Sequence, residues 1–248
     1  MRGALDVINS TATSSLRVWR GTLAKPAAVQ PEQLLQLYEF ESCPYCRLVR
    51  EVLTELDLDA MVYPCPQNGE RYRDKVVELG GHRQFPFLVD PNTGEAIYES
   101  DKIIAYLYKT YGQRKPPFGV RELAVAGSIT ASMVRGTQKA LPSKSAEQPL
   151  VLYSFESSPF CRRVRELLCE LEIAYELRNS GKAMIQDMGP PALRKMLFPS
   201  LPVQGRNRQR LLEETGRVQF PYLIDPNTNT ALFESADINQ YLLDTYKQ

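Results

Sequence analysis

The sequence predicts an α/β protein of two tandem domains, each with a mixed four-stranded sheet and the element order βαβαββα. Three observations lead to this prediction. Two sequence blocks recur along the 248-residue chain, strand-like and helix-like patterns alternate inside each copy, and a segment with Pro, Lys and Ser at its ends separates the copies. Two copies are too few for a solenoid, so we expect each copy to be a small domain in itself.

The repeat consists of two blocks. Residues 38–57 match residues 153–172 with 13 identities in 20, and residues 84–111 match residues 219–246 with 16 identities in 28. Copy two has 20 extra residues between its blocks, and the stretch Gly189–Gly205, rich in Pro, is their predicted place. The predicted boundaries are an N-terminal arm (1–33), domain 1 (34–112), a connector (113–149) and domain 2 (150–248).

The elements of domain 1 follow from hydrophobic periodicity. Residues 35–40 form an apolar, aromatic-rich run of strand length, and Val49, Leu53 and Leu56 then recur at helical spacing. Pro44 is favoured in the first turn of this helix, because its missing N–H has no partner there in any case. The remaining predicted elements are strand 61–63, helix 72–79, strand 87–89, a turn at 90–94, strand 96–98 and helix 99–111. Domain 2 repeats this order from residue 150 to residue 246.

The connector contains one candidate helix, Arg121–Arg135, which has small residues and little apolar bulk. We expect it to pack on the domains. The alternative is that it docks on a partner or a membrane surface, because small residues let backbones approach closely.

Charge and composition exclude several classes of protein. The chain has 30 Lys and Arg against 29 Asp and Glu, so it lacks the basic field of a nucleic-acid-binding protein. No apolar run approaches the roughly 20 residues of a membrane-spanning helix, so we do not expect an integral membrane protein. Five cysteines are far too few for a secreted disulfide scaffold, which predicts an intracellular, reducing location.

The first 33 residues are rich in Ser and Thr and contain four basic residues. This bias resembles the flank of an organelle transit peptide and predicts a plastid location, in the chloroplast stroma or peripheral to the thylakoid. An arm docked on the domains would show the same bias.

The motif C-P-Y-C at residues 43–46 carries the predicted chemistry. A cysteine at a helix N-terminus faces unpaired N–H groups and the positive end of the helix dipole, which favour the thiolate. Cys43 is therefore the predicted nucleophile, and Cys46 is placed to resolve a mixed disulfide formed at Cys43. Arg47 and Arg50 add positive charge nearby. The alternatives are a chance pair of cysteines or half of a metal site.

C-P-Y-C after a first strand and at the start of a helix resembles the dithiol site of glutaredoxins, on a thioredoxin-like fold. Phe-Pro and Glu-Ser pairs farther along resemble glutathione-binding positions of the N-terminal domain of glutathione transferases. Over residues 34–111 and 150–246 the chain is similar to tandem glutathione-transferase N-terminal, thioredoxin-like proteins of plants and algae. The resemblance implies glutathione as co-substrate. The implied glutathione-binding residues are Tyr45, Phe85, Pro86, Glu99 and Ser100.

The resemblance also implies cis prolines at Pro86 and Pro221. A cis peptide bond turns the backbone polar groups of the preceding residue outward, where they could pair with a peptide or with the cysteinyl part of glutathione.

Glu99-Ser100 and Glu234-Ser235 lie where helices begin. N–H groups, hydroxyl and carboxylate converge there, which suits the charged groups of a γ-glutamyl moiety. The alternative is that Ser100 and Ser235 only cap their helices.

Domain 2 lacks the attacking thiol. Ser158 stands at the nucleophile position and Cys161 at the resolving position, so thiol exchange cannot start there. The other positions of this degenerate second site are Phe220, Pro221, Glu234 and Ser235. Domain 2 is expected to be a binding or structural module, because a serine-type transferase would also need an all-helical C-terminal domain.

The remaining thiols, Cys65 and Cys169, are predicted to be structural, with a redox role for Cys65 as the alternative. His82 could join Cys43, Cys46 and Cys65 around zinc, but the spacing fits no known finger. We therefore expect no metal, and an iron–sulfur cluster shared between subunits is the remote alternative.

The leading hypothesis is a glutathione-linked thiol–disulfide oxidoreductase acting on protein disulfides or glutathionylated proteins. The rival is a non-catalytic scaffold or assembly factor that binds a larger protein complex through the arm or the connector. Glutathione conjugation is a third and weaker hypothesis.

Overall fold

The computed structural model describes residues 4–16, 19–117, 128–129, 137–184, 196 and 202–248. The predicted element order is present in both domains. Domain 1 contains β1 (Leu35–Glu39), α2 (Pro44–Glu55), β2 (Ala60–Pro64), α3 (Arg73–Gly80), β3 (Phe87–Asp90), β4 (Glu95–Tyr98), α4 (Ser100–Leu107) and a π-helical turn, η1 (Tyr108–Gly112). Domain 2 contains β5 (Leu150–Ser154), α6 (Pro159–Glu170), β6 (Tyr175–Asn179), α8 (Arg206–Thr215), β7 (Tyr222–Asp225), β8 (Thr230–Phe233) and α9 (Ser235–Tyr246).

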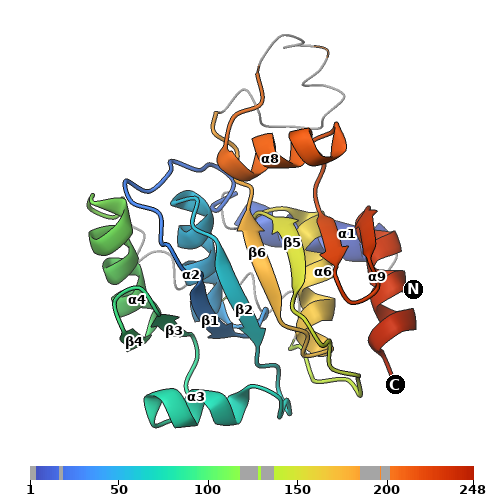
Figure 1. The fold of residues 1–248 in the computed structure, drawn as a ribbon, viewed down its shortest axis with the longest axis horizontal. Helices are drawn as coiled ribbons and strands as arrows, with labels where there is room; N and C mark the ends of the chain where they lie inside the picture. Colours follow the sequence, from blue (N-terminus) through green and yellow to red (C-terminus); the bar gives the residue numbers. More distant parts are fainter. Residues whose placement is uncertain (1–3, 17–18, 118–127, 130–136, 185–195, 197–201) are drawn as a thin grey trace.

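The strands of both domains form one continuous sheet of eight strands, in the order β4-β3-β1-β2-β6-β5-β7-β8 (Figure 1). Within each domain the first two strands are parallel and the last two are antiparallel to their neighbours, as the prediction of mixed sheets requires. The domains join where β2 pairs with β6 antiparallel, with Met61 opposite Glu176 at the centre of the register. Neither strand is left as an edge.

Helices cover both faces of the sheet because side chains alternate along each strand. Leu35 and Leu37 of β1 share a buried core with residues of α2 and α4, including Val49 and Ile103. Tyr38 packs on the opposite face with Val76 of α3 and with Phe87. Domain 2 repeats this arrangement, and Val62 of β2 packs into the core of domain 2. The two domains therefore share packed side chains as well as backbone hydrogen bonds.

The segment before each domain packs on the other domain. Helix α1 (Ala4–Leu16) precedes domain 1 but lies against α6 of domain 2 (Figure 1). Farther along, Leu23 forms a parallel bridge with Lys182 of domain 2, and Lys139 before domain 2 forms the matching bridge with Gln67 of domain 1. The described part of the first 33 residues thus docks on the domains, as the alternative explanation of the composition expected.

Two arginines connect the domains by hydrogen bonds at the C-terminal ends of α6 and α2. Arg71 donates to the carbonyl oxygens of Leu171 and Glu172 at the end of α6, at 3.0 and 2.6 Å. Arg206, at the equivalent position of domain 2, donates to the Asp57 carbonyl oxygen at the end of α2, at 3.1 Å. Each guanidinium satisfies carbonyl groups that a helix leaves without partners at its C-terminus.

Two predicted features fall mostly outside the described residues. The candidate helix Arg121–Arg135 is described only at 128–129, where the chain is helical, and the insert Gly189–Gly205 only at 196 and 202–205. Within the described part of the chain, no helix combines the length and the apolar character needed to cross a membrane.

Candidate functional site

The first candidate site is the start of α2. Cys43 is the residue before the helix, with an extended backbone (φ −67°, ψ 121°), and its Sγ accepts a hydrogen bond from the Cys46 N–H at 3.3 Å. Pro44 takes the first helical position, as predicted. Cys43 is 4% exposed and Cys46 is fully buried. Both are free thiols, as are the other three cysteines.

The surroundings of the two thiols shift their pKa values in opposite directions. The pKa of Cys43 is lowered, first by a hydrogen bond from the Cys46 side chain, against the effect of burial, and further by the N–H groups of Cys46 and Tyr45 and the charge of Arg50. Burial is the main reason that the pKa of Cys46 is raised well above its usual value. A thiolate at Cys43 beside a protonated Cys46 suits the predicted division into attacking and resolving thiols.

The second side of this site is the loop before β3. The Phe85–Pro86 peptide bond is cis, as the resemblance implied. The Phe85 ring meets the edge of Phe40, which lies in the loop that leads to Cys43, with ring centroids 6.0 Å apart. The Arg73 guanidinium lies over the Phe85 ring at 5.1 Å. The cis-proline loop is thereby packed against the cysteine loop, so the structure brings these two predicted parts of the site together.

The two Glu-Ser pairs lie at helix starts, as predicted, but neither serine takes the capping position. Glu99 (φ 69°, ψ 125°) and Glu234 (φ 67°, ψ 118°) take the capping positions without a side-chain capping bond, while Ser100 and Ser235 are the first helical residues. The prediction that the serines cap α4 and α9 is therefore wrong, because the turn places the glutamates in the left-handed backbone region just before each helix. Such backbone conformations are uncommon in non-glycine residues and concentrate at functional sites.

The corresponding site of domain 2 keeps this geometry without the attacking thiol. Ser158 precedes α6 with φ −66° and ψ 120°, and its Oγ accepts a hydrogen bond from the Cys161 N–H at 3.3 Å. The Phe220–Pro221 bond is cis, and Phe220 meets Phe155 edge-on at 5.9 Å. Burial raises the pKa of the Cys161 thiol, which is fully buried. Domain 2 thus has a hydroxyl and a buried thiol at the positions where domain 1 has Cys43 and Cys46.

Each site is covered by the segment that precedes the other domain. Ser128 of the connector donates from Oγ to the Pro44 carbonyl oxygen at 2.7 Å, and Ser10 of α1 donates to the equivalent Pro159 oxygen at 2.9 Å. Ser128 and Ser10 are themselves fully buried. Beside these covers, Tyr45 remains 45% exposed. The low exposure of Cys43 is thus associated with a hydrogen-bonded contact from the connector.

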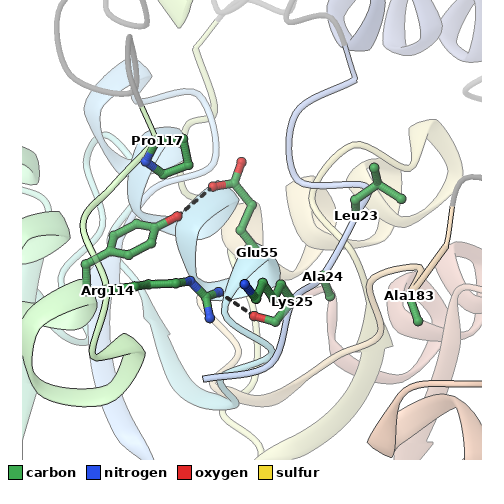
Figure 2. A pocket seen from close by; sticks show the side chains of 8 residues that line it. Leu23, Ala24, Lys25, Glu55, Arg114, Pro117 and Ala183 are labelled. Atoms are coloured by element: carbon green, nitrogen blue, oxygen red, sulfur yellow. Dashed lines mark hydrogen bonds between the residues drawn. The ribbon is translucent and has the colours of Figure 1, made fainter. Parts of the chain in front are cut away.

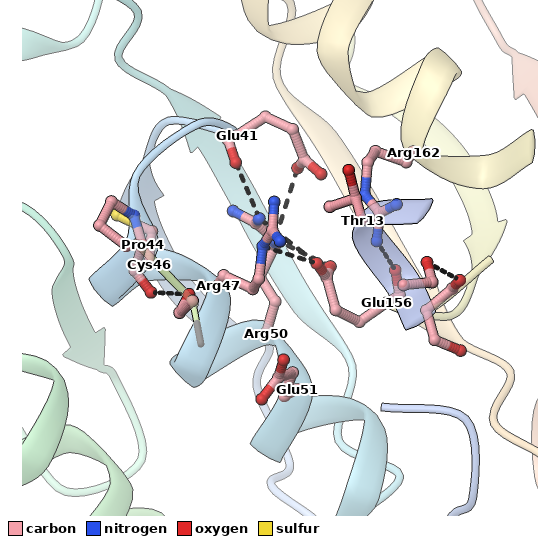
Figure 3. Close-up of polar contacts among 12 residues, drawn as sticks. Thr13, Glu41, Pro44, Cys46, Arg47, Arg50, Glu51, Glu156 and Arg162 are labelled. Carbon is pink, nitrogen blue, oxygen red and sulfur yellow. Dashed lines mark hydrogen bonds and ion pairs between the residues drawn. The ribbon is translucent and has the colours of Figure 1, made fainter. Parts of the chain in front are cut away.

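Between the two sites lies a buried network of ion pairs (Figure 3). Arg50 donates to Glu39, to the Glu41 carbonyl oxygen at 3.0 Å and to Glu156 Oε2 at 3.0 Å. Arg165 is the equivalent arginine of domain 2, and its Nη2 lies 2.9 Å from Glu41 Oε1 and 2.8 Å from Glu156 Oε2. Each domain thus supplies one glutamate that meets the arginines of both domains. Burial opposes ionisation of Glu156, but Arg165 and Arg50 outweigh it and lower its pKa to about 2.

Arg47, which the sequence placed near Cys43, extends toward domain 2 instead. Its Nε lies 3.9 Å from Glu156 Oε1, and neither Nε nor Nη1 has a hydrogen-bond partner among the residues that the structure describes. Arg162, the equivalent residue of domain 2, donates from Nη1 to the Ser10 carbonyl oxygen at 2.6 Å. Burial lowers the pKa of Arg47 from its ordinary value.

Three further candidate residues, Cys65, Cys169 and His82, lie outside the C-P-Y-C motif. Cys65 is fully buried and Cys169 is 2% exposed, and burial raises the pKa of both. The His82 ring stacks on Tyr98 with centroids 4.2 Å apart. A search of the described residues found no group of three metal-ligating side chains.

A pocket of about 380 Å³ lies at the other end of α2 (Figure 2). Its wall includes Glu55, Tyr108 and Arg114. Tyr108 donates to Glu55 Oε2 at 3.2 Å, and Arg114 donates to the carbonyl oxygen of Pro26 at 3.1 Å. The carboxylate and the guanidinium thus already have partners within the protein.

Two features were not predicted from the sequence: the serines that contact Pro44 and Pro159, and the interdomain glutamates. A signal for the covers was present: the tripeptide Arg-Gly-Thr at residues 20–22 recurs at residues 135–137, so the repeat extends into the arm and the connector. Glu41 and Glu156 are identical in the two blocks. Their pairing across the domains could not be read from the sequence, because it depends on how the sheets join.

Comparison with known protein families matches two segments of the chain, residues 37–115 and 152–248, to the glutathione S-transferase N-terminal domain. Among curated proteins no match was found. Two structures of a Bombyx mori glutathione transferase are similar at 26% and 27% identity, with TM-scores of 0.31 and 0.30. Each covers 37% of this chain, which spans less than half of those chains, 44% and 43%. A trimeric Leishmania glutathione transferase is 13% identical, with a TM-score of 0.28, over 87% of this chain and 68% of its own.

Proposed function

Because the chain belongs to the glutathione S-transferase N-terminal domain family and contains two copies of that domain, we propose that it is a glutathione-linked thiol–disulfide oxidoreductase. The observation that carries this proposal is the pair at the start of α2. Cys43 has a lowered pKa, and the protonated Cys46 donates a hydrogen bond to it. A low pKa raises the thiolate fraction, and the thiolate is the nucleophile in disulfide exchange.

The proposed reaction is reduction of a glutathionylated protein. The Cys43 thiolate attacks the glutathione sulfur of the mixed disulfide, a Cys43–glutathione disulfide forms, and the protein leaves as a thiolate that takes up a proton. A second glutathione, as thiolate, then attacks the glutathione sulfur of that disulfide, releasing oxidised glutathione and the Cys43 thiolate. One free glutathione is consumed per turnover: its sulfur joins the glutathione sulfur of the substrate as oxidised glutathione, the protein sulfur is reduced to a thiol, and the enzyme ends unchanged.

Cys46 offers a second route, in which it attacks Cys43 Sγ and expels glutathione as an internal disulfide forms. This attack needs a Cys46 thiolate, and burial raises the pKa of Cys46 well above its usual value. The route through a second glutathione is therefore expected to be the faster one.

Glutathione is proposed to lie between α2, the cis-proline loop and the start of α4. The backbone of Phe85 before Pro86 would pair with its cysteinyl part, and Glu99 and Ser100 would meet its γ-glutamyl part. Tyr45, at 45% exposure, would flank the thiol. The packing of Phe85 on Phe40 supports this placement, because it sets the cis-proline loop beside the cysteine loop.

Reduction of a glutathionylated peptide by glutathione tests the proposal. Cys43→Ser should lower the rate at least about 100-fold, because an alcohol is not ionised at neutral pH, whereas Cys46→Ser should keep most of it. Cys169→Ser, which removes a buried thiol that lies outside the C-P-Y-C motif, serves as the matched control. Turnover that survives Cys43→Ser unchanged would refute the proposal. Conjugation of glutathione to a generic electrophile is expected to be absent in all of these proteins.

One observation favours the scaffold hypothesis as a second candidate. Cys43 is only 4% exposed, and Ser128 of the connector is bonded to Pro44 beside it. A protein substrate must displace this contact to reach the thiol. If the protein is a scaffold, a complex purified from its native source keeps its composition after Cys43→Ser and dissociates when residues 4–16 are deleted.

A plastid location is proposed from the composition of residues 1–33 alone, although the docked helix α1 accounts for much of that composition by structure. The full chain fused to a fluorescent protein should accumulate in plastids, and a diffuse cytosolic signal would contradict this.

A further inference from the structure

Arg50 connects the reactive thiol of domain 1 to a carboxylate of domain 2. It lies seven residues after Cys43, so the two side chains project from the same face of α2, two turns apart. Its Nη2 donates to the carbonyl oxygen of Glu41, two residues before Cys43, which places the guanidinium under the loop that carries the thiol. The same guanidinium donates from Nε to Glu156 Oε2 at 3.0 Å.

The Arg50–Glu156 pair is shielded from water and salt. The side chain of Arg50 is 1% exposed and that of Glu156 is 3% exposed. Figure 3 shows the two side chains pointing toward each other from different domains, with Arg50 on α2 and Glu156 in the loop before α6. Charges act over longer distances in such surroundings than at the surface, because little water screens them. A carboxylate at this place therefore offsets part of the positive charge that Arg50 presents to Cys43.

We propose that Glu156, although it belongs to the domain without a nucleophile, tunes the thiol chemistry of domain 1 by offsetting the charge of Arg50 beneath Cys43. Domain 2 would then be part of the redox site and more than a structural partner. The inference rests on the proposed function for its biological meaning, because it concerns the same thiol, but it makes a statement about Cys43 that can be measured without any turnover.

Several titratable groups surround Arg50 and Cys43, and they come from every element packed there. Among the described residues these groups include Glu39 on β1, Glu41 in the following loop, Cys46, Arg47 and Glu51 on α2, Cys65 after β2, Glu156 before α6, Arg162, Arg165 and Cys169 on α6, and Tyr175 on β6. Glu39 titrates at about 8, within the range of interest, because burial raises its pKa. The test must therefore separate Glu156 from Glu39.

The pH dependence of the alkylation rate at Cys43 measures the effect directly. Iodoacetamide reacts with the thiolate, and peptide mass spectrometry assigns the product to Cys43, so the midpoint reports the pKa of that thiol whatever its exposure. Glu156→Gln removes the negative charge and keeps the size and an accepting oxygen for Arg50. The midpoint should fall by about one pH unit, the scale of one buried charge interaction. The same fall is expected in a Glu39→Gln background, where the single variant Glu39→Gln is compared with the double variant that also carries Glu156→Gln.

Asp59→Asn is the matched control. Asp59 is also a buried acid at the domain interface and pairs with an arginine of the other domain, Arg206, at 2.7 Å. It follows the C-terminal end of α2, and a 12-residue helix separates it from Cys43 by about 18 Å. Its midpoint should equal that of the wild type.

Glu156→Asp provides a second variant if Glu156→Gln does not fold. It keeps the charge in the cluster but withdraws the carboxylate from Arg50 by one methylene group, so a fall of about 0.3 pH unit is expected. An unchanged or raised midpoint in the folded variants, or an equal fall in Asp59→Asn, would overturn the inference. Loss of oxidoreductase activity alone would leave the inference standing, because alkylation of Cys43 requires neither glutathione nor substrate.

Discussion

At the residue scale, the two copies differ at the buried position that ends the first strand of each domain. Glu39 ends β1 and pairs with Arg50, whereas Ser154 ends β5 and accepts a hydrogen bond from Arg165 at 2.9 Å. The copy with Cys43 thus carries a buried acid where the copy with Ser158 carries a hydroxyl. Burial raises the pKa of Glu39 to about 8, despite the opposing charge of Arg50.

This raised pKa predicts a pH-dependent stability. The unfolded chain releases the Glu39 proton near pH 4.5, while the folded protein keeps it until about pH 8, so the contribution of Glu39 is complete below pH 4.5 and is lost as pH rises toward 8. Urea unfolding of the wild type and of Glu39→Gln should be measured at several pH values. As pH rises, the wild type should lose more unfolding free energy than Glu39→Gln does. The expected slope is up to about 1 kcal/mol of unfolding free energy per pH unit. Parallel curves for the two proteins would contradict it.

At the element scale, the first turn of each site helix, α2 and α6, accepts a hydrogen bond from a serine in the other half of the chain. The Ser128–Pro44 and Ser10–Pro159 hydrogen bonds are equivalent contacts at the first turns of α2 and α6. Loss of one buried hydrogen bond costs about 1 kcal/mol, which corresponds to roughly a fivefold change in an opening equilibrium. The two serines therefore provide a matched pair for testing whether the connector controls access to Cys43.

Ser128→Ala should raise the alkylation rate of Cys43 about fivefold at a fixed pH, because the cover opens more often. Ser10→Ala, which removes the equivalent contact from domain 2, should leave that rate at the wild-type value. Equal rates in the two variants, or no change in Ser128→Ala, would show that the hydroxyl contact does not limit access.

At the scale of the whole molecule, the two domains form one structural unit. The β2–β6 pairing makes a single eight-stranded sheet, and Val62 of domain 1 is fully buried in the core of domain 2. Two covers and two helix-end arginines also cross between the domains. Unfolding one domain would expose the edge strand and part of the core of the other.

Val62→Ala should therefore destabilise both domains together, by about 2 kcal/mol, although the substitution lies in only one of them. Hydrogen exchange followed by mass spectrometry would show reduced protection in both β1 and β5. Val89→Ala, on the partly buried side of β3 in domain 1, is the control and should lower protection mainly in its own domain. A loss confined to domain 1 in Val62→Ala would mean that the domains unfold independently.

The sequence by itself determined the elements and the local geometry of the sites. Apolar periodicity and Pro44 predicted α2 and its start, and the structure begins the helix at that residue. Such features depend on neighbours within a few turns, so they can be read from a short stretch of chain. The capping position was predicted wrongly because Glu99 and Ser100 both suit a helix start, and only the path of the turn from β4 decides between them.

Only the tertiary structure decided how the two halves meet. The alternation in β2 marks a strand, but nothing in its residues names β6 as its partner, because backbone groups of any edge strand can pair with any other. The contacts of each N-terminal segment with the other domain and the Arg50–Glu156 pair follow from that single pairing, which sets α2 beside the loop before α6. Contacts between residues more than 100 positions apart depend on the packing of whole elements, and that information is spread over the entire chain.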